Sequence, residues 1–168
     1  MFFVAESCSY DDNSEEAIIE KGSDGLEFSF WLSDMDDKRT NIFDEKDIKE
    51  RGFYFNMSLT NNSDKNIYIT NGDIMPFLSE VFDTDSNYIG RSCAQFTDIY
   101  ILYKIQPGET HYESLFWCRY NVNTHDAILL PAGNYYTYFS RSLTYKSGDN
   151  YDLKTIEIPP MYINFEVK

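Results

Sequence analysis

Two histidines and many carboxylates are the side chains of this sequence that could transfer protons. His111 follows the turn Pro107-Gly108, and His125 lies in the polar segment 121–126. A serine hydrolase needs a histidine beside an activated serine, often in a Gly-x-Ser-x-Gly elbow, and the sequence contains no such elbow. Composition leaves a glycosidase-type carboxylate pair open. The carboxylates gather in the N-terminal segment and in turns, however, where burial does not raise a pKa. We therefore expect a protein that is not an enzyme, with solvent-facing histidines.

Two acidic segments have the oxygen-rich pattern of calcium loops. The segment Asp83–Asn87 places hard oxygen ligands at alternate positions, but an EF-hand loop would need Gly and Glu where Tyr88 and Ala94 stand. A hairpin turn built on Asp and Asn explains the segment better. The same choice, calcium or a solvated loop, applies to Asp34, Asp36 and Asp37. Because the cysteines and histidines lack zinc-ligand spacing, we expect no metal and no cofactor.

Aromatic side chains are the strongest signal of a binding surface. The chain has 14 Tyr and 13 Phe, and in the predicted strand 135–141 four of the first five residues are aromatic. Because side chains alternate along a strand, one set points inward and the other, Tyr136 and Tyr138 or their neighbours, points outward. With Trp117, these residues form a candidate surface for a protein or glycan. The alternative is that tyrosine only covers a solvent-facing sheet through cross-strand pairing.

These residues must be positioned by β-strands, because apolar residues recur with a period of two. Residues 53–60 alternate apolar and polar side chains, as expected for a half-buried strand. Further strands are predicted at 26–31, 67–69, 77–82, 96–105, 111–119, 135–141 and 161–167. Turn signals, among them Pro159-Pro160, separate them, and only 44–51 could form one or two helical turns. The sequence therefore predicts an all-β protein, a single antiparallel β-sandwich over residues 25–168.

Charge is concentrated in front of that domain. The formal net charge is −14, and residues 1–50 hold 15 acidic against 5 basic side chains. Residues 9–24 are polar and acidic, and they cannot bury enough apolar area to offset their ordering entropy. We expect residues 1–24 to form a flexible acidic spacer. A field of this sign also argues against nucleic acid and anionic lipid as partners.

The N-terminus resembles the end of a lipoprotein signal peptide. The apolar residues 1–5 precede Cys8, and the Ser- and Asp-rich stretch 9–12 follows it. The resemblance is to outer-membrane lipoproteins of Gram-negative anaerobes, and it implies lipidation of Cys8 and a place in the cell envelope or periplasm. The alternative is an ordinary intracellular N-terminus with a chance cysteine, and thus a cytoplasmic protein.

The two remaining cysteines fit that resemblance. If Cys8 carries lipid, Cys93 and Cys118 are an even pair in an oxidising compartment. A disulfide between them would enclose 24 residues. Closing such a loop contributes about 3 kcal/mol in the chain-entropy model. The alternative is two buried free thiols in apolar strands.

The order of turn motifs along residues 41–168 resembles Ig-like domains of such lipoproteins. The motifs are Asn61-Asn62-Ser63 after a strand, an acidic turn at 82–85, Pro107-Gly108-Glu109, Trp117 at a strand end, and Leu130–Tyr135. The same order occurs in the BsuPI family of intracellular proteinase inhibitors. The resemblance implies an Ig-like, Greek-key fold and an extracytoplasmic or inhibitory role, and it brings no catalytic residues.

Two classes of function follow from the sequence. The first is a non-catalytic extracytoplasmic binding or accessory module, monomeric, with a protein or glycan ligand. The second is an acidic inhibitor or immunity protein that captures a basic toxin or protease. An inhibitor should carry its acidity on the folded surface, whereas a tethered module should keep its ligand without residues 1–24.

Overall fold

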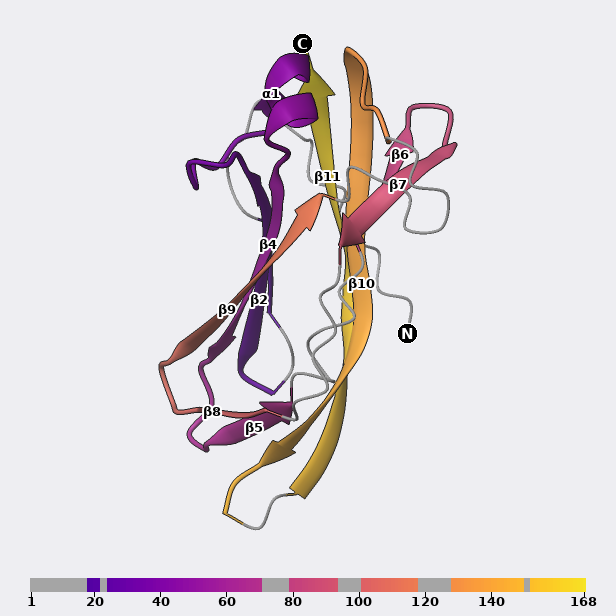
Figure 1. Ribbon diagram of the computed structural model, residues 1–168. Coiled ribbons are helices and arrows are strands. Elements are labelled where there is room, and N and C mark those ends of the chain that lie inside the picture. The colour runs from indigo at the N-terminus through magenta and orange to yellow at the C-terminus, as the bar shows by residue number, and fades with distance from the viewer. Residues whose placement is uncertain (1–17, 22–23, 71–78, 94–100, 118–127, 150–151) are drawn as a thin grey trace.

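The computed structural model describes residues 18–21, 24–70, 79–93, 101–117, 128–149 and 152–168, and in these ranges it has eleven β-strands and one helix (Figure 1). The strands are β1 (Ile18–Lys21), β2 (Leu26–Ser33), β3 (Ile42–Phe43), β4 (Tyr54–Asn61), β5 (Ile67–Thr70), β6 (Glu80–Asp83), β7 (Tyr88–Cys93), β8 (Leu102–Ile105), β9 (Thr110–Trp117), β10 (Gly133–Ser147) and β11 (Asp152–Val167). The helix is α1 (Glu45–Glu50). No helix in this part of the chain is long and apolar enough to cross a membrane. The prediction of an all-β protein is confirmed.

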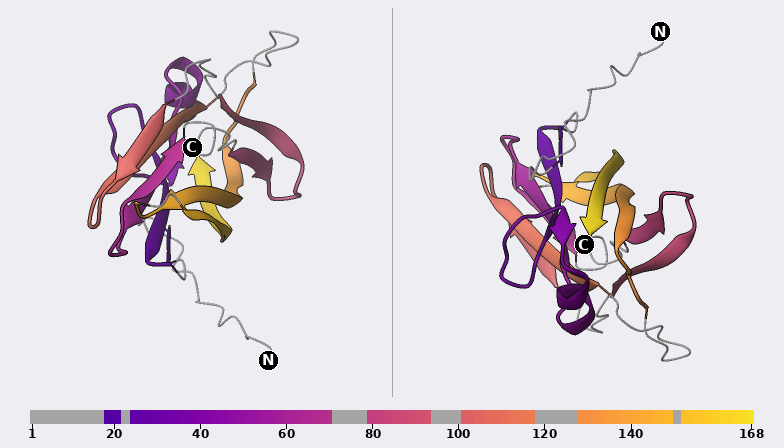
Figure 2. Two further views of the ribbon diagram at one scale, coloured as in Figure 1. Left: turned by 90° about the horizontal axis from the view of Figure 1, so that it is seen from below. Right: turned by 90° about the horizontal axis from the view of Figure 1, so that it is seen from above.

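Hydrogen bonds join the strands into one connected sheet. The order is β1-β2-β4-β9-β7-β6-β10-β11-β3, with β5 beside β10 and β8 beside β5. The described pairs are antiparallel except β3 with β11. The sheet turns back on itself at β7, whose first residues pair with β6 while Ser92 and Cys93 pair with β9. As a result β2, β4 and β9 face β10 and β11 in the end-on views (Figure 2).

The apolar core fills the space between these two faces. One face contributes Leu26, Phe28, Phe30, Leu32, Phe55, Met57 and Leu59, and the other contributes Phe139, Leu143, Met161, Ile163, Phe165 and Val167. Phe53, which precedes β4, is fully buried. Its ring centroid lies 4.9 to 5.7 Å from those of Phe43, Phe55, Phe165 and Trp117. Phe53 therefore joins both faces at one end of the core.

The helix α1 confirms the helical turns expected at 44–51. Asp44 caps its N-terminus, because Oδ1 accepts hydrogen bonds from the backbone N–H groups of Lys46 and Asp47 at 2.9 and 3.3 Å. Gly52 ends it in the left-handed region at φ 88°, with its N–H donated to the Asp47 carbonyl at 3.1 Å. A Cβ at Gly52 would also clash with the Phe116 ring, so the position requires glycine.

The expected spacer over residues 1–24 is wrong at its C-terminal end. Ile18–Lys21 forms β1, which pairs antiparallel with β2 from Phe30 to Glu27. Ile18 and Ile19 form a short apolar stretch within the acidic segment, and the backbone of residues 18–21 pairs with the edge of β2. The described structure therefore includes residues 18–21, ahead of the predicted domain start at residue 25.

Asp24 fastens the start of β2 to the β10–β11 hairpin. Its Oδ2 accepts a hydrogen bond from the Tyr145 hydroxyl at 2.6 Å and one from Lys154 Nζ at 3.1 Å. The Tyr145 bond, and then the Lys154 bond, hold the pKa of Asp24 below its usual value. Burial first, and then the carboxylate, raise the pKa of Tyr145.

Tyr145→Phe is expected to lower the free energy of unfolding by about 1 kcal/mol at pH 7, since one charge-assisted hydrogen bond is lost at a partly solvated carboxylate. Because the folded pKa of Asp24 is depressed, this stabilisation is present above the unfolded pKa and lost as pH falls through the folded value. The difference in the free energy of unfolding between Tyr145→Phe and the unaltered protein should therefore shrink below about pH 4. Urea unfolding between pH 3 and 7 measures it. Tyr112→Phe, at an exposed tyrosine of β9, should show no such pH dependence.

The expected turn at Pro159-Pro160 is also wrong, because both prolines lie inside β11. The pairing with β10 shifts register there: Phe139 lies opposite Met161 and Arg141 opposite Ile158. The two prolines thus lie opposite the single residue between Phe139 and Arg141, in a β-bulge that tolerates residues without a backbone N–H, and at most one of the missing N–H groups would have pointed to the edge of β11 away from β10. Of the described strands, β3 covers that edge of β11 only at Glu166 and Val167.

Two buried polar atoms in the described ranges lack a hydrogen-bond partner, Trp117 Nε1 and Thr137 Oγ1. Thr137 is fully buried on β10. Thr137→Val keeps the shape and removes the unsatisfied hydroxyl, so we expect the free energy of unfolding to rise by about 1 kcal/mol in chemical denaturation. Thr110→Val is the control, because the Thr110 hydroxyl bonds to the Thr60 hydroxyl at 2.9 Å, and its loss should destabilise. A loss of stability in Thr137→Val would contradict this account.

Candidate functional site

Strands β7, β6, β10 and β11 are neighbours in that order (Figure 1). Five aromatic side chains lie together on the outward face of these strands. We call this set the aromatic strip: Phe82, Tyr88, Tyr136, Tyr138 and Tyr162. The strand register creates it. Phe82 is opposite Tyr88 on one side and Tyr136 on the other, and Tyr138 is opposite Tyr162. Residues directly opposite one another share a face, so the rings form a continuous cross-strand row.

The rings of the aromatic strip contact one another in sequence. Phe82 stacks on Tyr136 at a centroid distance of 5.3 Å and on Tyr138 at 6.0 Å, with interplanar angles of 17° and 23°. Tyr88 meets Phe82 edge-on at 5.9 Å, and Tyr162 lies 5.6 Å from Tyr138. Each ring therefore restricts its neighbour, and little side-chain entropy is left to lose when a ligand binds.

The aromatic strip is open to solvent and framed by polar residues. Tyr88 and Tyr162 are 53% and 49% exposed, and the other three side chains are half-buried. The same outward face carries Asn134, Asn164, Glu80, Arg91 and Glu166, placed by the same cross-strand pairs. The site therefore combines apolar ring surface with amide, carboxylate and guanidinium groups.

Strand β10 fixes which tyrosines point outward. Tyr135 is buried, and its hydroxyl donates a hydrogen bond to the Pro131 carbonyl at 2.8 Å. Burial, and then the nearby charge of Asp83, raise the pKa of Tyr135. Because Tyr135 is held inward, alternation directs Tyr136 and Tyr138 to the opposite face. Both expected residues thus lie on the outward face, whereas their binding role stays a proposal.

Trp117 does not belong to an exposed surface, which corrects the expectation for this residue. Its side chain is fully buried and stacks on Phe53 at 5.6 Å and 14°. The last residues of β9 alternate as elsewhere, and Trp117 falls on the inner side. Gly90 accommodates the indole, because a Cβ there would lie 2.7 Å from Trp117 Cη2.

The sequence missed three residues of the aromatic strip. Tyr88 begins β7, a strand that was not predicted, because Gly90 and Ser92 occupy its inward positions and remove the apolar alternation. Phe82 ends a predicted strand whose facing was unknown. Tyr162 had a usable signal: in the predicted strand 161–167 it stands between the apolar residues Met161 and Ile163, and alternation places it on the opposite face from them.

The cysteines are only partly described. Cys93 is disulfide-bonded, so it is not the free thiol of the alternative interpretation. Cys8 and Cys118 lie outside the described residues, and the pairing of Cys93 with Cys118 therefore stays a prediction.

The residues weighed for proton transfer and calcium have local structural partners. His111 Nε2 lies 2.9 Å from Glu113 Oε1, while His125 is outside the described residues. Asp83 Oδ1 accepts the N–H groups of Asp85 and Asn87 at 3.0 and 2.8 Å, and the Asn87 amide donates to Asp83 Oδ2. These bonds lower the pKa of Asp83 and make the segment a hairpin turn. Across the part of the chain with defined structure, no group of three potential ligands is placed to hold a metal.

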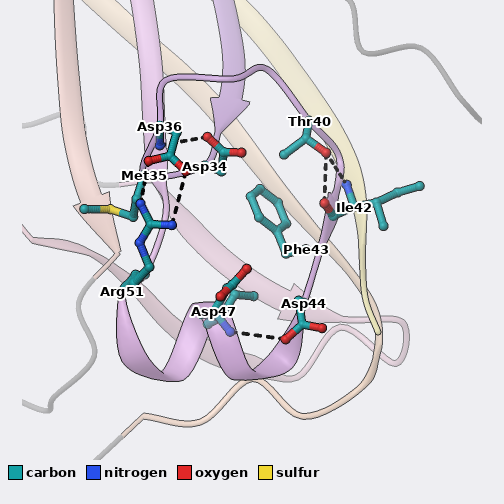
Figure 3. A pocket seen from close by; sticks show the side chains of 11 residues that line it. Asp34, Met35, Asp36, Thr40, Ile42, Phe43, Asp44, Asp47 and Arg51 are labelled. Atoms are coloured by element: carbon teal, nitrogen blue, oxygen red, sulfur yellow. Dashed lines mark hydrogen bonds and ion pairs between the residues drawn. The ribbon is translucent and has the colours of Figure 1, made fainter.

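An acidic pocket, separate from the aromatic strip, lies between α1 and the loop after β2 (Figure 3). Its volume is about 100 Å³, Phe43 lies within it, and it is lined by Asp34, Asp36, Asp44, Asp47 and Arg51 among others. Arg51 pairs with Asp36 at 2.6 Å, and this exposed pair lowers the pKa of the carboxyl and raises that of the guanidinium. Asp34 Oδ1 accepts the N–H groups of Asp36 and Lys38, so it shapes the loop.

Fold and site together define an all-β protein with an outward aromatic face. Among solved structures, the chain is similar to a Bordetella pertussis protein provisionally named ApaA, with a TM-score of 0.41 and 11% identity over 87% of this chain and 96% of that one. It is also similar to the structural genomics target SoR45, with a TM-score of 0.36 and 11% identity over 88% of this chain and 80% of that one. No family model and no curated protein matches the sequence, so the resemblance to Ig-like lipoproteins and the BsuPI family has no support from these comparisons.

Proposed function

We propose that this protein is a non-catalytic binding module whose ligand contacts the aromatic strip. The observation that carries the proposal is the continuous row of five partly exposed rings across four neighbouring strands. Tyrosine supplies large, rigid contact area at low entropic cost, and its hydroxyl can bond to a polar ligand. Core packing does not account for the row, since the inward side chains of the same strands already fill the core.

The fold proposed for this module is an Ig-like, Greek-key β-sandwich. Two features support it: the facing of β2, β4 and β9 with β10 and β11, and the hydrogen bond from Tyr135 to Pro131. In Ig-like domains a tyrosine near the start of a strand commonly bonds back to the backbone a few residues upstream. Such a scaffold holds a sheet face rigid for binding.

Printed arrays of glycans and of peptides, probed with the labelled full chain, test the binding proposal. The double variant Tyr136→Ser/Tyr138→Ser should lose the signals that the unaltered protein gives. Tyr112→Ser is the matched control, because Tyr112 is 65% exposed on β9, outside the aromatic strip, and its signals should persist. Near-equal unfolding midpoints of the three proteins verify that the variants fold. If every array signal survived in the double variant, the proposal would be wrong.

We also propose that the module is held at the cell envelope through a lipid on Cys8. The support is the sequence context of Cys8, an apolar stretch before it and a Ser- and Asp-rich stretch after it. Cells that produce the full chain are grown with radiolabelled palmitate. The protein should take up label, Cys8→Ser should not, and globomycin should block processing. A Cys8→Ser protein that fractionates like the unaltered one would refute the anchor.

The second candidate is an acidic inhibitor, and the acidic pocket favours it. Asp34, Asp44 and Asp47 outnumber the single cation Arg51 there, and this is acidity on the folded surface. A basic protease such as trypsin is the probe. Inhibition that weakens steeply with salt and falls in Asp34→Asn/Asp47→Asn would support this function, and unchanged protease activity would exclude trypsin-like targets.

A further inference from the structure

We propose that the ligand of the aromatic strip is a neutral oligosaccharide that lies across strands β7, β6, β10 and β11. This inference rests on the proposed binding function and names its ligand class. It is carried by the size of the aromatic strip, by the groups around it and by the charge of the protein.

The size of the aromatic strip fits a narrow, chain-like ligand. Four neighbouring strands span three inter-strand spacings, or about 14 Å, and two alternate residues along each strand cover about 7 Å. A stable protein–protein interface buries about 800 Å² on each partner, well above such a footprint. The exposed aliphatic side chains that could enlarge it are mostly elsewhere: Leu102 is on β8, Leu129 precedes β10, and Leu153 is at the far end of β11.

The groups around the rings suit a ligand rich in hydroxyls. The apolar faces of sugar rings pack on aromatic rings, and their hydroxyls need hydrogen-bond partners at the rim. Asn164 lies opposite Tyr136, and Glu80 lies opposite Tyr138. Arg91 lies opposite Glu80, one row from Tyr88. Residues with amide, carboxylate and guanidinium groups therefore flank the aromatic row on both sides.

Charge selects a neutral sugar. The protein carries a net charge of −14; beside the aromatic strip, Glu80 lies opposite Arg91, and Glu166 pairs with Lys168 at 3.5 Å, so the cations there are already matched by carboxylates. A uronate or sulfated glycan would be repelled by this field. A neutral oligosaccharide is not repelled by this negative field, so its affinity for the protein should depend little on salt.

The test is calorimetric titration of the full chain with neutral hexaoses (malto-, cello-, xylo- and manno-hexaose), guided by the neutral spots of the glycan array, and with oligogalacturonate as the anionic probe. At least one neutral sugar should bind. Its affinity should fall at least about tenfold, a change of about 1.4 kcal/mol, in Tyr136→Ser/Tyr138→Ser and stay unchanged in Tyr112→Ser. It should change less than about twofold between 50 and 500 mM salt, and oligogalacturonate should bind more weakly.

Failure of this inference is distinguishable from failure of the binding function. If peptides bind through Tyr136 and Tyr138 while no neutral sugar does, the module has a protein ligand and the sugar inference is overturned. The same holds if oligogalacturonate binds more tightly than every neutral sugar. If nothing on either array depends on the two tyrosines, both the function and the inference are overturned.

Discussion

Replacing Phe53 by alanine should lower the free energy of unfolding by about 3–5 kcal/mol, the usual cost of deleting a buried aromatic ring. Phe53 is fully buried and contacts four other aromatic rings, two of them within 4.9 Å. These rings come from β3, β4, β9 and β11, so the cavity would open where the two faces of the core meet. Urea or guanidinium unfolding, followed by circular dichroism, measures the loss.

Phe82→Ala is the matched control for that experiment. It deletes the same ring from a half-buried position on the outward face, where no core cavity results. Its cost should stay below about 1.5 kcal/mol. Equal losses in the two variants would show that the aromatic strip, and not only the interior, holds the fold together, and would weaken the case for a ligand there.

The second large effect concerns the disulfide at Cys93. Cys93→Ser should cost about 3 kcal/mol if the bond closes a loop of 24 residues. The predicted partner is Cys118, because the sequence has three cysteines and Cys8 is the predicted lipid attachment site. Cys118→Ser and the double variant should therefore lose the same amount as Cys93→Ser. Thermal and urea unfolding without reductant measure these losses.

Cys8→Ser is the control that makes the cysteine series decisive. It should leave stability unchanged, because Cys8 is the predicted lipid attachment site and not a partner of Cys93. Addition of dithiothreitol should lower the unfolding midpoint of the unaltered protein to that of Cys93→Ser. A loss in Cys8→Ser with none in Cys118→Ser would assign the bond to Cys8, and the lipid anchor would then be wrong.

Strands with clear alternation could be predicted from the sequence, and the rest could not for local reasons. β2 and β4 alternate apolar and polar residues, and both were found within two residues of their ends. β7 was not predicted because its inward positions hold the small residues Gly90 and Ser92 instead of the large apolar residues that indicate an inner face. The extension of β10 to Ser147 and of β11 from Asp152 makes a long hairpin that the prolines seemed to interrupt. β1 was not predicted because it has only four residues, and because its partner, the edge of β2, is known only from the strand order.

The candidate site was predictable only in part for a related reason. Alternation shows that Tyr136 and Tyr138 share a face, but only the inward bond of Tyr135 decides which face it is. For Trp117, too, the sequence does not show whether the side chain points inward or outward, and in the structure it is buried. The neighbours of these tyrosines, Phe82 and Tyr162, depend on strand order, which a single sequence does not state.

The two prolines in β11 have a consequence for how this protein behaves at high concentration. A long exposed strand edge is a template for a strand of another molecule, and chains can add to it in succession. Successive backbone N–H groups point to opposite sides of a strand, so the two prolines remove at most one donor from that edge, while the bulge bends it. An incoming strand would therefore meet a bent edge in the middle of its ladder. The hairpin that carries the tyrosines can thus be long without becoming a seed for aggregation.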